Sequence, residues 1–133
     1  MNENVEKLAK NLVNYSCSLK KGEKILIEGG QDAENLICAI VKEVYKVGGY
    51  PFVDIKNQAI NREILKGTSK EHSSLMASYM LPKITDMDAY IGITASKNIY
   101  ELSNVDKNRI QDYNVYYQKP IHHDVRVTKT KWV

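Results

Sequence analysis

Cysteine, arginine and long apolar stretches are scarce in this chain of 133 residues, and each scarcity excludes a class of protein. The two cysteines, Cys17 and Cys38, lie in apolar helical patterns, so we expect reduced core thiols rather than a disulfide. No stretch approaches the roughly 20 apolar residues of a membrane span. The first residues, MNENVEKLAK, mix acids with lysines, unlike a signal peptide. We therefore expect a cytoplasmic protein with no membrane partner.

Arginine occurs only at Arg62, Arg109 and Arg126, although the formal net charge is +3. Proteins that read nucleic acids favour arginine, because its planar guanidinium makes bidentate contacts with bases and phosphates. The basic residues here are mostly lysine, and no run gathers several on one face. We interpret this charge as a solvated, lysine-rich surface and expect no nucleic-acid partner.

The first half of the chain predicts a helix, a strand, a second helix and a second strand. The run Ile25-Leu26-Ile27 does not alternate, which is typical of a strand buried on both faces of a parallel sheet. A helix with Asp32 as its N-cap and Gly48 at its end should follow, and then a strand over Tyr50–Ile55. A right-handed crossover makes the two strands parallel. The first helix, over about residues 4–15, is predicted by apolar residues at helical spacing: Val5, Leu8, Ala9, Leu12 and Val13.

Residues 57–86 predict two helices. The first ends at Gly67, and the second begins with a capping box of Thr68 and Glu71 and ends at Pro82. The segment Ala89–Thr94 predicts a third strand, in which Gly92 indicates the close approach of a neighbouring backbone or side chain. The apolar side of the second helix should consist of Leu75, Met76, Tyr79 and Met80.

The last part of the chain predicts a helix over 104–117 that Pro120 closes, a loop, and a fourth strand that starts near Lys131. We therefore expect a single α/β domain over residues 1–133. It should be a three-layer α/β/α fold with a mostly parallel sheet of about four strands in the order 2-1-3-4, Rossmann-like without a nucleotide motif. The inward residues of the last helix should be Val105, Ile110, Tyr113 and Tyr117, with Tyr116 beside them in an aromatic stripe at the edge of the core.

Few residues are candidates for chemistry. His122, His123 and Asp124 form the only local cluster of metal-binding residue types, but neighbours on an extended chain point to opposite sides, which favours a solvated loop. His72 has no histidine or cysteine at helical spacing and is interpreted as a surface residue. We assign no catalytic, cofactor-binding or metal residue.

Two other features of the sequence resemble binding or catalytic sites. The turn Glu28–Asp32 lies where a doubly wound fold binds phosphate, but its two carboxylates would repel an anion, so a nucleotide pocket is the weaker alternative. Ser73 and Ser74 lack the strand-to-helix turn that exposes a nucleophile.

Four segments in order carry a family resemblance: LVNYSCSLKKGEKILIEGG, VYKVGGYP, DMDAYIGITASKN with Ala95 and Asn98, and TKTKWV. They resemble the N-terminal part of the dinuclear metallo-aminopeptidases typified by aminopeptidase T and aminopeptidase S, the thermophilic metalloprotease family. The resemblance implies the N-terminal domain of a longer cytoplasmic aminopeptidase that removes N-terminal residues from peptides. It implies no cofactor in this chain, and two divalent metal ions, zinc, cobalt or similar, held by residues later than Val133.

The resemblance also implies what this part of the enzyme does. The N-terminal domain would wall the active-site cavity and take part in a homodimer, and peptide substrate would bind through the missing catalytic domain. We expect the chain alone to be inactive, and its end on the first residues of a strand to reflect a cut in a longer protein. The alternative is a free-standing α/β binding or assembly module without peptidase chemistry.

Overall fold

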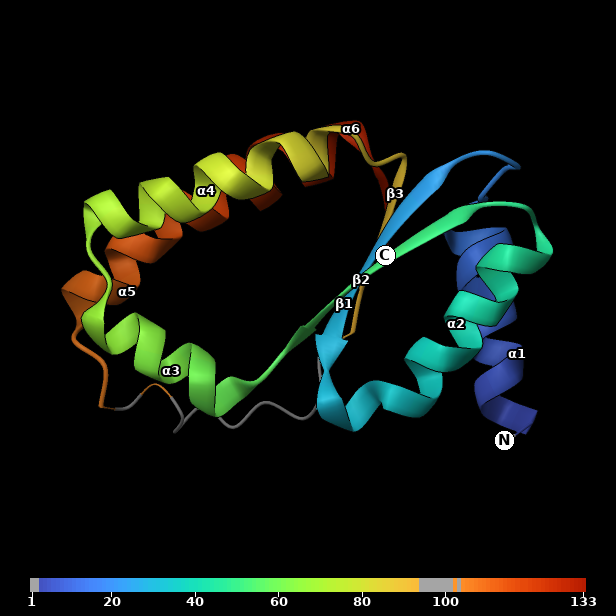
Figure 1. The fold of residues 1–133 in the computed structure, drawn as a ribbon, viewed down its shortest axis with the longest axis horizontal. Helices are drawn as coiled ribbons and strands as arrows, with labels where there is room; N and C mark the ends of the chain where they lie inside the picture. The colour runs from blue at the N-terminus through green and yellow to red at the C-terminus, as the bar shows by residue number, and fades with distance from the viewer. Residues whose placement is uncertain (1–2, 94–101, 103) are drawn as a thin grey trace. The chain divides into compact units, whose positions relative to one another are not determined.

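The computed structural model describes residues 3–93, 102 and 104–133 (Figure 1). They form two compact units. Unit 1 contains the described residues of 1–56, 87–95 and 129–133, and unit 2 contains the described residues of 57–86 and 96–128. No helix of the described residues combines the length and the apolar character that crossing a bilayer requires.

Unit 1 is built on a four-stranded, fully parallel sheet in the order β2-β1-β3-β4, as predicted. Its strands are β1 (Lys24–Gly30), β2 (Tyr50–Lys56), β3 (Ala89–Gly92) and β4 (Lys131–Trp132). The α/β class and the parallel sheet are confirmed, and they are consistent with a three-layer α/β/α fold. The chain passes from β1 to β2 on one side and then to β3 on the other, so the winding reverses between β1 and β3. In folds of this kind the carboxyl ends at the reversal are where ligands bind.

The helices of unit 1 are α1 (Glu3–Asn11), which continues as the wider turns of η1 (Leu12–Ser16), and α2 (Glu34–Lys46). In Figure 1, α1 and α2 lie side by side, and they contact each other along their lengths. The core on this face of the sheet contains Ala9, Val13, Cys17, Leu19, Ile25, Ile27, Ile37, Ala39, Ile40, Val44, Ala89 and Ile91.

The ends of α2 confirm one prediction and correct another. Gly48 follows the helix with φ +81°, the left-handed conformation expected of it. Asp32 is not the N-cap: it lies in the short turn η2 (Gln31–Ala33), and Ala33 occupies the cap position without a side-chain hydrogen bond. The tight turn between β1 and α2 moves the helix start past the aspartate.

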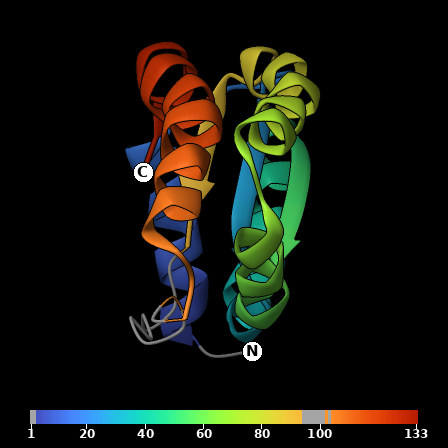
Figure 2. The same cartoon turned by 90° about the vertical axis from the view of Figure 1, so that its left-hand side faces the viewer.

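Unit 2 is helical. It contains α3 (Gln58–Gly67), α4 (Lys70–Thr85), α5 (Lys107–Tyr113) and the π-helix η4 (Asn114–Arg126). The chain continues from η4 through α6 (Val127–Lys129) to β4. Figure 2 shows α4 and η4 side by side, and these two helices are in contact. Tyr113 and Tyr117 are buried and stacked with ring centroids 4.9 Å apart, as the predicted aromatic stripe requires.

Both predicted helix ends at proline are wrong, because α4 continues past Pro82 and η4 past Pro120. The loop predicted before the fourth strand is also wrong, since the chain is helical to Lys129. Beyond these points, the predicted strand near Lys131 is confirmed.

The start and the buried face of α4 differ from the prediction. Ser69, not Thr68, is the N-cap, and its hydroxyl accepts the His72 N–H at 3.1 Å. Thr68 is fully buried, with its hydroxyl 2.9 Å from Ser73 Oγ. Leu75 and Tyr79 are exposed, while the buried positions of this helix are Ser73, Ala77 and Ile84. Met76 and Met80, the other two predicted residues, are partly buried, so the prediction holds for these two and fails for Leu75 and Tyr79.

The third strand is confirmed for Ala89–Gly92. A Cβ atom on Gly92 would lie 3.0 Å from Tyr90 Cε1, so the close approach predicted there is made by a side chain. Thr94, Ala95 and Asn98 lie outside the described residues.

Candidate functional site

The carboxyl ends of β1 and β3, where the winding of the sheet reverses, hold a buried carboxylate. Glu28 is only 5% exposed, and its Oε1 accepts the Tyr90 hydroxyl at 2.6 Å. Its Oε2 makes no hydrogen bond to any residue that the structure describes, but lies 3.5 Å from Lys56 Nζ at the end of β2. We call Glu28, Tyr90 and Lys56 the Glu28 cluster.

The Glu28 cluster is better suited to joining strands than to chemistry. A short hydrogen bond from a phenol to a carboxylate is strong, and the lysine balances the charge. Because Gly92 has no side chain, the Tyr90 ring can lie over β3 and reach Glu28. A negative charge here also opposes phosphate binding, as the sequence suggested.

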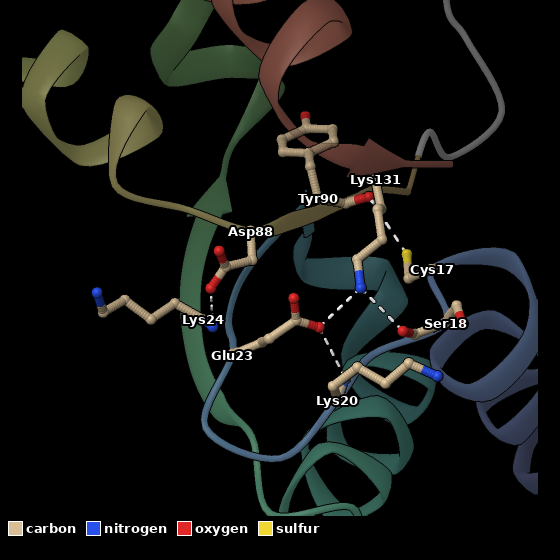
Figure 3. A network of polar contacts seen from close by, with 8 residues as sticks. All are labelled: Cys17, Ser18, Lys20, Glu23, Lys24, Asp88, Tyr90 and Lys131. Carbon is tan, nitrogen blue, oxygen red and sulfur yellow. Dashed lines mark hydrogen bonds and ion pairs between the residues drawn. The ribbon is translucent and has the colours of Figure 1, made fainter.

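A second polar network lies at the opposite end of the strands, where β1, β3 and β4 begin (Figure 3). Lys131 Nζ donates to the Ser18 carbonyl oxygen at 2.8 Å and to Glu23 Oε1 at 2.7 Å. Glu23 Oε1 also accepts the Lys20 backbone N–H at 2.7 Å. Close by, the Lys24 N–H donates to Asp88 Oδ2 at 2.9 Å, which ties the start of β1 to the start of β3.

The network changes the acidity of two of its members. Burial raises the pKa of Glu23, but the hydrogen bonds from Lys131 and Lys20 outweigh it, so the pKa lies below its ordinary value of 4.5. Burial raises the pKa of the Cys17 thiol to about 11, against the opposing positive charge of Lys131. Cys17 is therefore a protonated core thiol and not a nucleophile at neutral pH.

The histidine cluster is helical rather than a loop, which corrects the prediction, and its members bind different partners. His122 Nδ1 accepts the Arg126 Nε–H at 2.9 Å, whereas Asp124 pairs with Lys119 Nζ at 3.2 Å. His123 is exposed. His72 is also exposed, which confirms its interpretation as a surface residue.

Metal binding needs several convergent ligands, and the residues described do not supply them. Within residues 3–93, 102 and 104–133, no group of three or more histidine, cysteine or acidic side chains is placed to hold an ion. The chain's described donor set therefore does not fit a dinuclear metal centre, and we derive no catalytic step through one.

Burial decides whether Ser73 and the two cysteines are accessible for chemistry. Ser73 is fully buried and bonded to Thr68, so it is not an accessible nucleophile. The expectation of two core thiols holds for Cys17 but is wrong for Cys38, which is free and exposed on α2. Sequence reasoning missed both polar networks; the one available signal was Glu28 itself, an acid at the end of an otherwise apolar buried strand.

Comparison with known proteins identifies both a family and a fold. The family described as thermophilic metalloprotease (M29) matches residues 1–133. Among solved structures, wild-type AmpT from Thermus thermophilus is similar, with a TM-score of 0.74 and 17% sequence identity. That likeness covers 98% of this chain and 34% of the AmpT chain, so this chain spans about a third of that protein's length. No curated protein matches significantly.

Proposed function

Because the chain belongs to the thermophilic metalloprotease (M29) family, we propose that it is the N-terminal part of a cytoplasmic metal-dependent aminopeptidase that removes N-terminal residues from peptides. The family match over residues 1–133 carries the proposal. The likeness to AmpT over only 34% of that chain supports assigning this chain to one part of a longer enzyme.

In this proposal the chemistry belongs to a segment outside this chain. By membership of a metalloprotease family, two divalent ions, zinc, cobalt or similar, would be held there. The two polar networks support this proposal, because Glu28 and Lys131 make hydrogen bonds to neighbouring strands and loops of their own unit.

The contribution of this chain would be to wall the active-site cavity and to assemble a homodimer. Large aromatic side chains exposed on each of its two units would be available for such contacts. Tyr15, Tyr45 and Tyr79 are each exposed by more than half, at 76%, 65% and 80%.

A free-standing binding or assembly module is the second candidate. The observation that favours it is the same engagement of the polar side chains in the fold, such as Glu28 with Tyr90 and Lys131 with Glu23. It differs from the first candidate in one respect: it requires no catalytic partner segment.

The experiment is a peptidase assay of the chain alone. Aminoacyl p-nitroanilides and short peptides would be incubated with it after addition of zinc, cobalt or manganese. We expect turnover at the level of buffer. Turnover that chelator abolishes, in material purified to constant specific activity, would overturn the assignment of catalysis to another segment.

A further inference from the structure

The outer edge of β2 is open. This strand lies at one end of the order β2-β1-β3-β4, and both described strands that follow it in the chain lie on the far side of β1. Among the described residues, β2 therefore pairs with β1 only, over all 7 of its residues. An edge strand of this length presents a row of unpaired backbone groups, which is a template for another strand.

The backbone groups on the open edge follow from the register. The Tyr50 N–H donates to Glu23 O at 2.8 Å, just before β1 begins, so the backbone groups of Tyr50 point towards β1. The direction alternates along a strand, so the N–H and C=O groups of Val53 and Ile55 point to the open edge. Pro51 shares that side and offers a carbonyl but no N–H, which is the position where a sheet tolerates proline.

The side chains around the open edge are apolar. Val53 and Ile55 are 38% and 52% exposed, and Phe52 is exposed on the opposite face of the strand. Edge strands that avoid association usually carry charged side chains, especially lysine. Within Pro51–Ile55 the only charged residue is Asp54, which is partly buried. Apart from the proline at its start, the edge therefore lacks the features that prevent pairing with another strand.

One side of α2 continues this apolar surface. Ala39 and Glu43 line a groove together with residues of α1, so that side of α2 faces α1. Val41 and Tyr45, four residues apart, lie on the opposite side of the helix. Tyr45 is exposed, and Val41 is partly buried against the core. Since α2 also contacts β2, these two side chains extend the apolar surface of the open edge.

The backbone of β2 is complementary to itself in one antiparallel register. With Val53 opposite Val53 of a second copy, the whole strand overlaps with its counterpart, and the two valines exchange both backbone hydrogen bonds. Each Ile55 N–H then reaches the Pro51 carbonyl of the other copy. The missing N–H of proline therefore costs only the outermost bond at each end.

The side chains select the same register. Tyr50 would lie opposite Lys56 and Phe52 opposite Asp54, so that no like charges are directly opposed. A shift of two residues in one direction sets Asp54 opposite Asp54 of the second copy, which is unfavourable. A shift of two residues in the other direction leaves Ile55 without a partner. A shift of one residue places inward-pointing backbone groups opposite outward-pointing ones.

We propose that two copies of this chain associate through β2, antiparallel and centred on Val53, so that their sheets join into one continuous sheet. The proposal names the surface of the homodimer in the proposed function, and it rests on that part of the proposed function rather than on peptidase activity. The self-complementary register is what favours a second copy as the occupant. Val41 and Tyr45 of the two copies would then face each other across the same two-fold axis.

Sedimentation velocity over a dilution series tests the association. The wild-type chain should form a dimer as its concentration rises. Val53→Lys places two ammonium groups directly opposite each other at the axis and should raise the dimer dissociation constant about a hundredfold. Leu8→Lys, the same kind of change at an exposed position on α1, is the matched control and should leave the constant unchanged. Thermal melting followed by circular dichroism should show that both variants fold.

Disulfide formation tests the register and decides the matter even if Val53→Lys does not fold. In a Cys38→Ser background, Val53→Cys should give a covalent dimer under oxidising conditions, because directly opposed residues have Cα atoms about 5.5 Å apart. Ile55→Cys is the matched control at a more exposed position. It should stay unlinked, because the two copies of residue 55 would be about 13 Å apart along the strands.

The outcomes separate this surface from the homodimer itself. A wild-type chain that is monomeric at every concentration would overturn both. A dimer that Val53→Lys leaves intact, or that Leu8→Lys weakens equally, would overturn the β2 surface and leave the homodimer to another part of the molecule. Equal cross-linking of Val53→Cys and Ile55→Cys would indicate random collision and would overturn the paired strands.

Discussion

Replacement of Leu26 by aspartate should abolish cooperative folding. Leu26 lies in the middle of β1, opposite Phe52 on β2 and Tyr90 on β3, and is 1% exposed. The change removes about 1.5–3 kcal/mol of apolar burial. It also places an unpaired carboxylate in the interior, which costs several kcal/mol more. The total is comparable with the whole stability of a domain, about 5–15 kcal/mol.

Urea and thermal unfolding, monitored by circular dichroism, would measure this loss. Leu26→Ala should stay folded but lose about 2–5 kcal/mol, the usual cost of a truncated core leucine. Leu8→Asp, at a position 46% exposed on α1, is the matched control and should melt nearly as the wild-type chain does. A Leu26→Asp chain that melts cooperatively, with a free energy of unfolding within about 1 kcal/mol of wild type, would refute the burial argument.

Two further predictions concern the thiols and the Glu23 carboxylate. In the folded chain iodoacetamide should modify the exposed Cys38 and spare the buried Cys17, whose pKa is raised to about 11. In denaturant both cysteines should react, and mass spectrometry of the alkylated protein distinguishes the two sites. Rapid labelling of Cys17 under native conditions would contradict its burial. The pKa of Glu23 is lowered by folding, so its carboxylate stabilises the fold above about pH 4.5, and this contribution is lost as the pH falls through the folded-state value. Glu23→Gln should therefore destabilise the chain at pH 7 but much less at pH 3, and an equal loss at both pH values would exclude the ion pair with Lys131 as the cause.

The sheet could be predicted from the sequence because its signals are local and unambiguous. The unbroken apolar run Ile25-Leu26-Ile27 indicates a strand that is covered on both faces. Gly48 indicates the end of a helix, because glycine readily takes the positive φ that is found there. Right-handed crossovers then leave few possible strand orders. The observed order β2-β1-β3-β4 is the simplest one that keeps the crossovers right-handed and β1 internal.

The start and the buried face of α4 could not be predicted, because tertiary contacts decide them. Thr68 and Ser69 are both good caps, and burial of Thr68 against Ser73 leaves Ser69 to cap α4. Nothing local distinguishes Ala77, which is buried, from Tyr79, which is exposed.

The polar networks depend on contacts between residues far apart in the chain. Glu28 meets Tyr90 and Glu23 meets Lys131 only after the sheet has formed. Charge and spacing in the sequence therefore do not reveal which partner either glutamate binds.

We propose that this chain is one part of a metallo-aminopeptidase whose catalytic residues lie elsewhere. The most direct test is to read the coding frame beyond the codon for Val133, express the continuous protein, and measure release of N-terminal residues from peptides with and without chelator. The account predicts a continuation rich in histidine, glutamate and aspartate, and chelator-sensitive release that residues 1–133 alone do not give. A frame that stops after Val133, or a continuous protein that releases nothing with zinc, cobalt or manganese present, would contradict it.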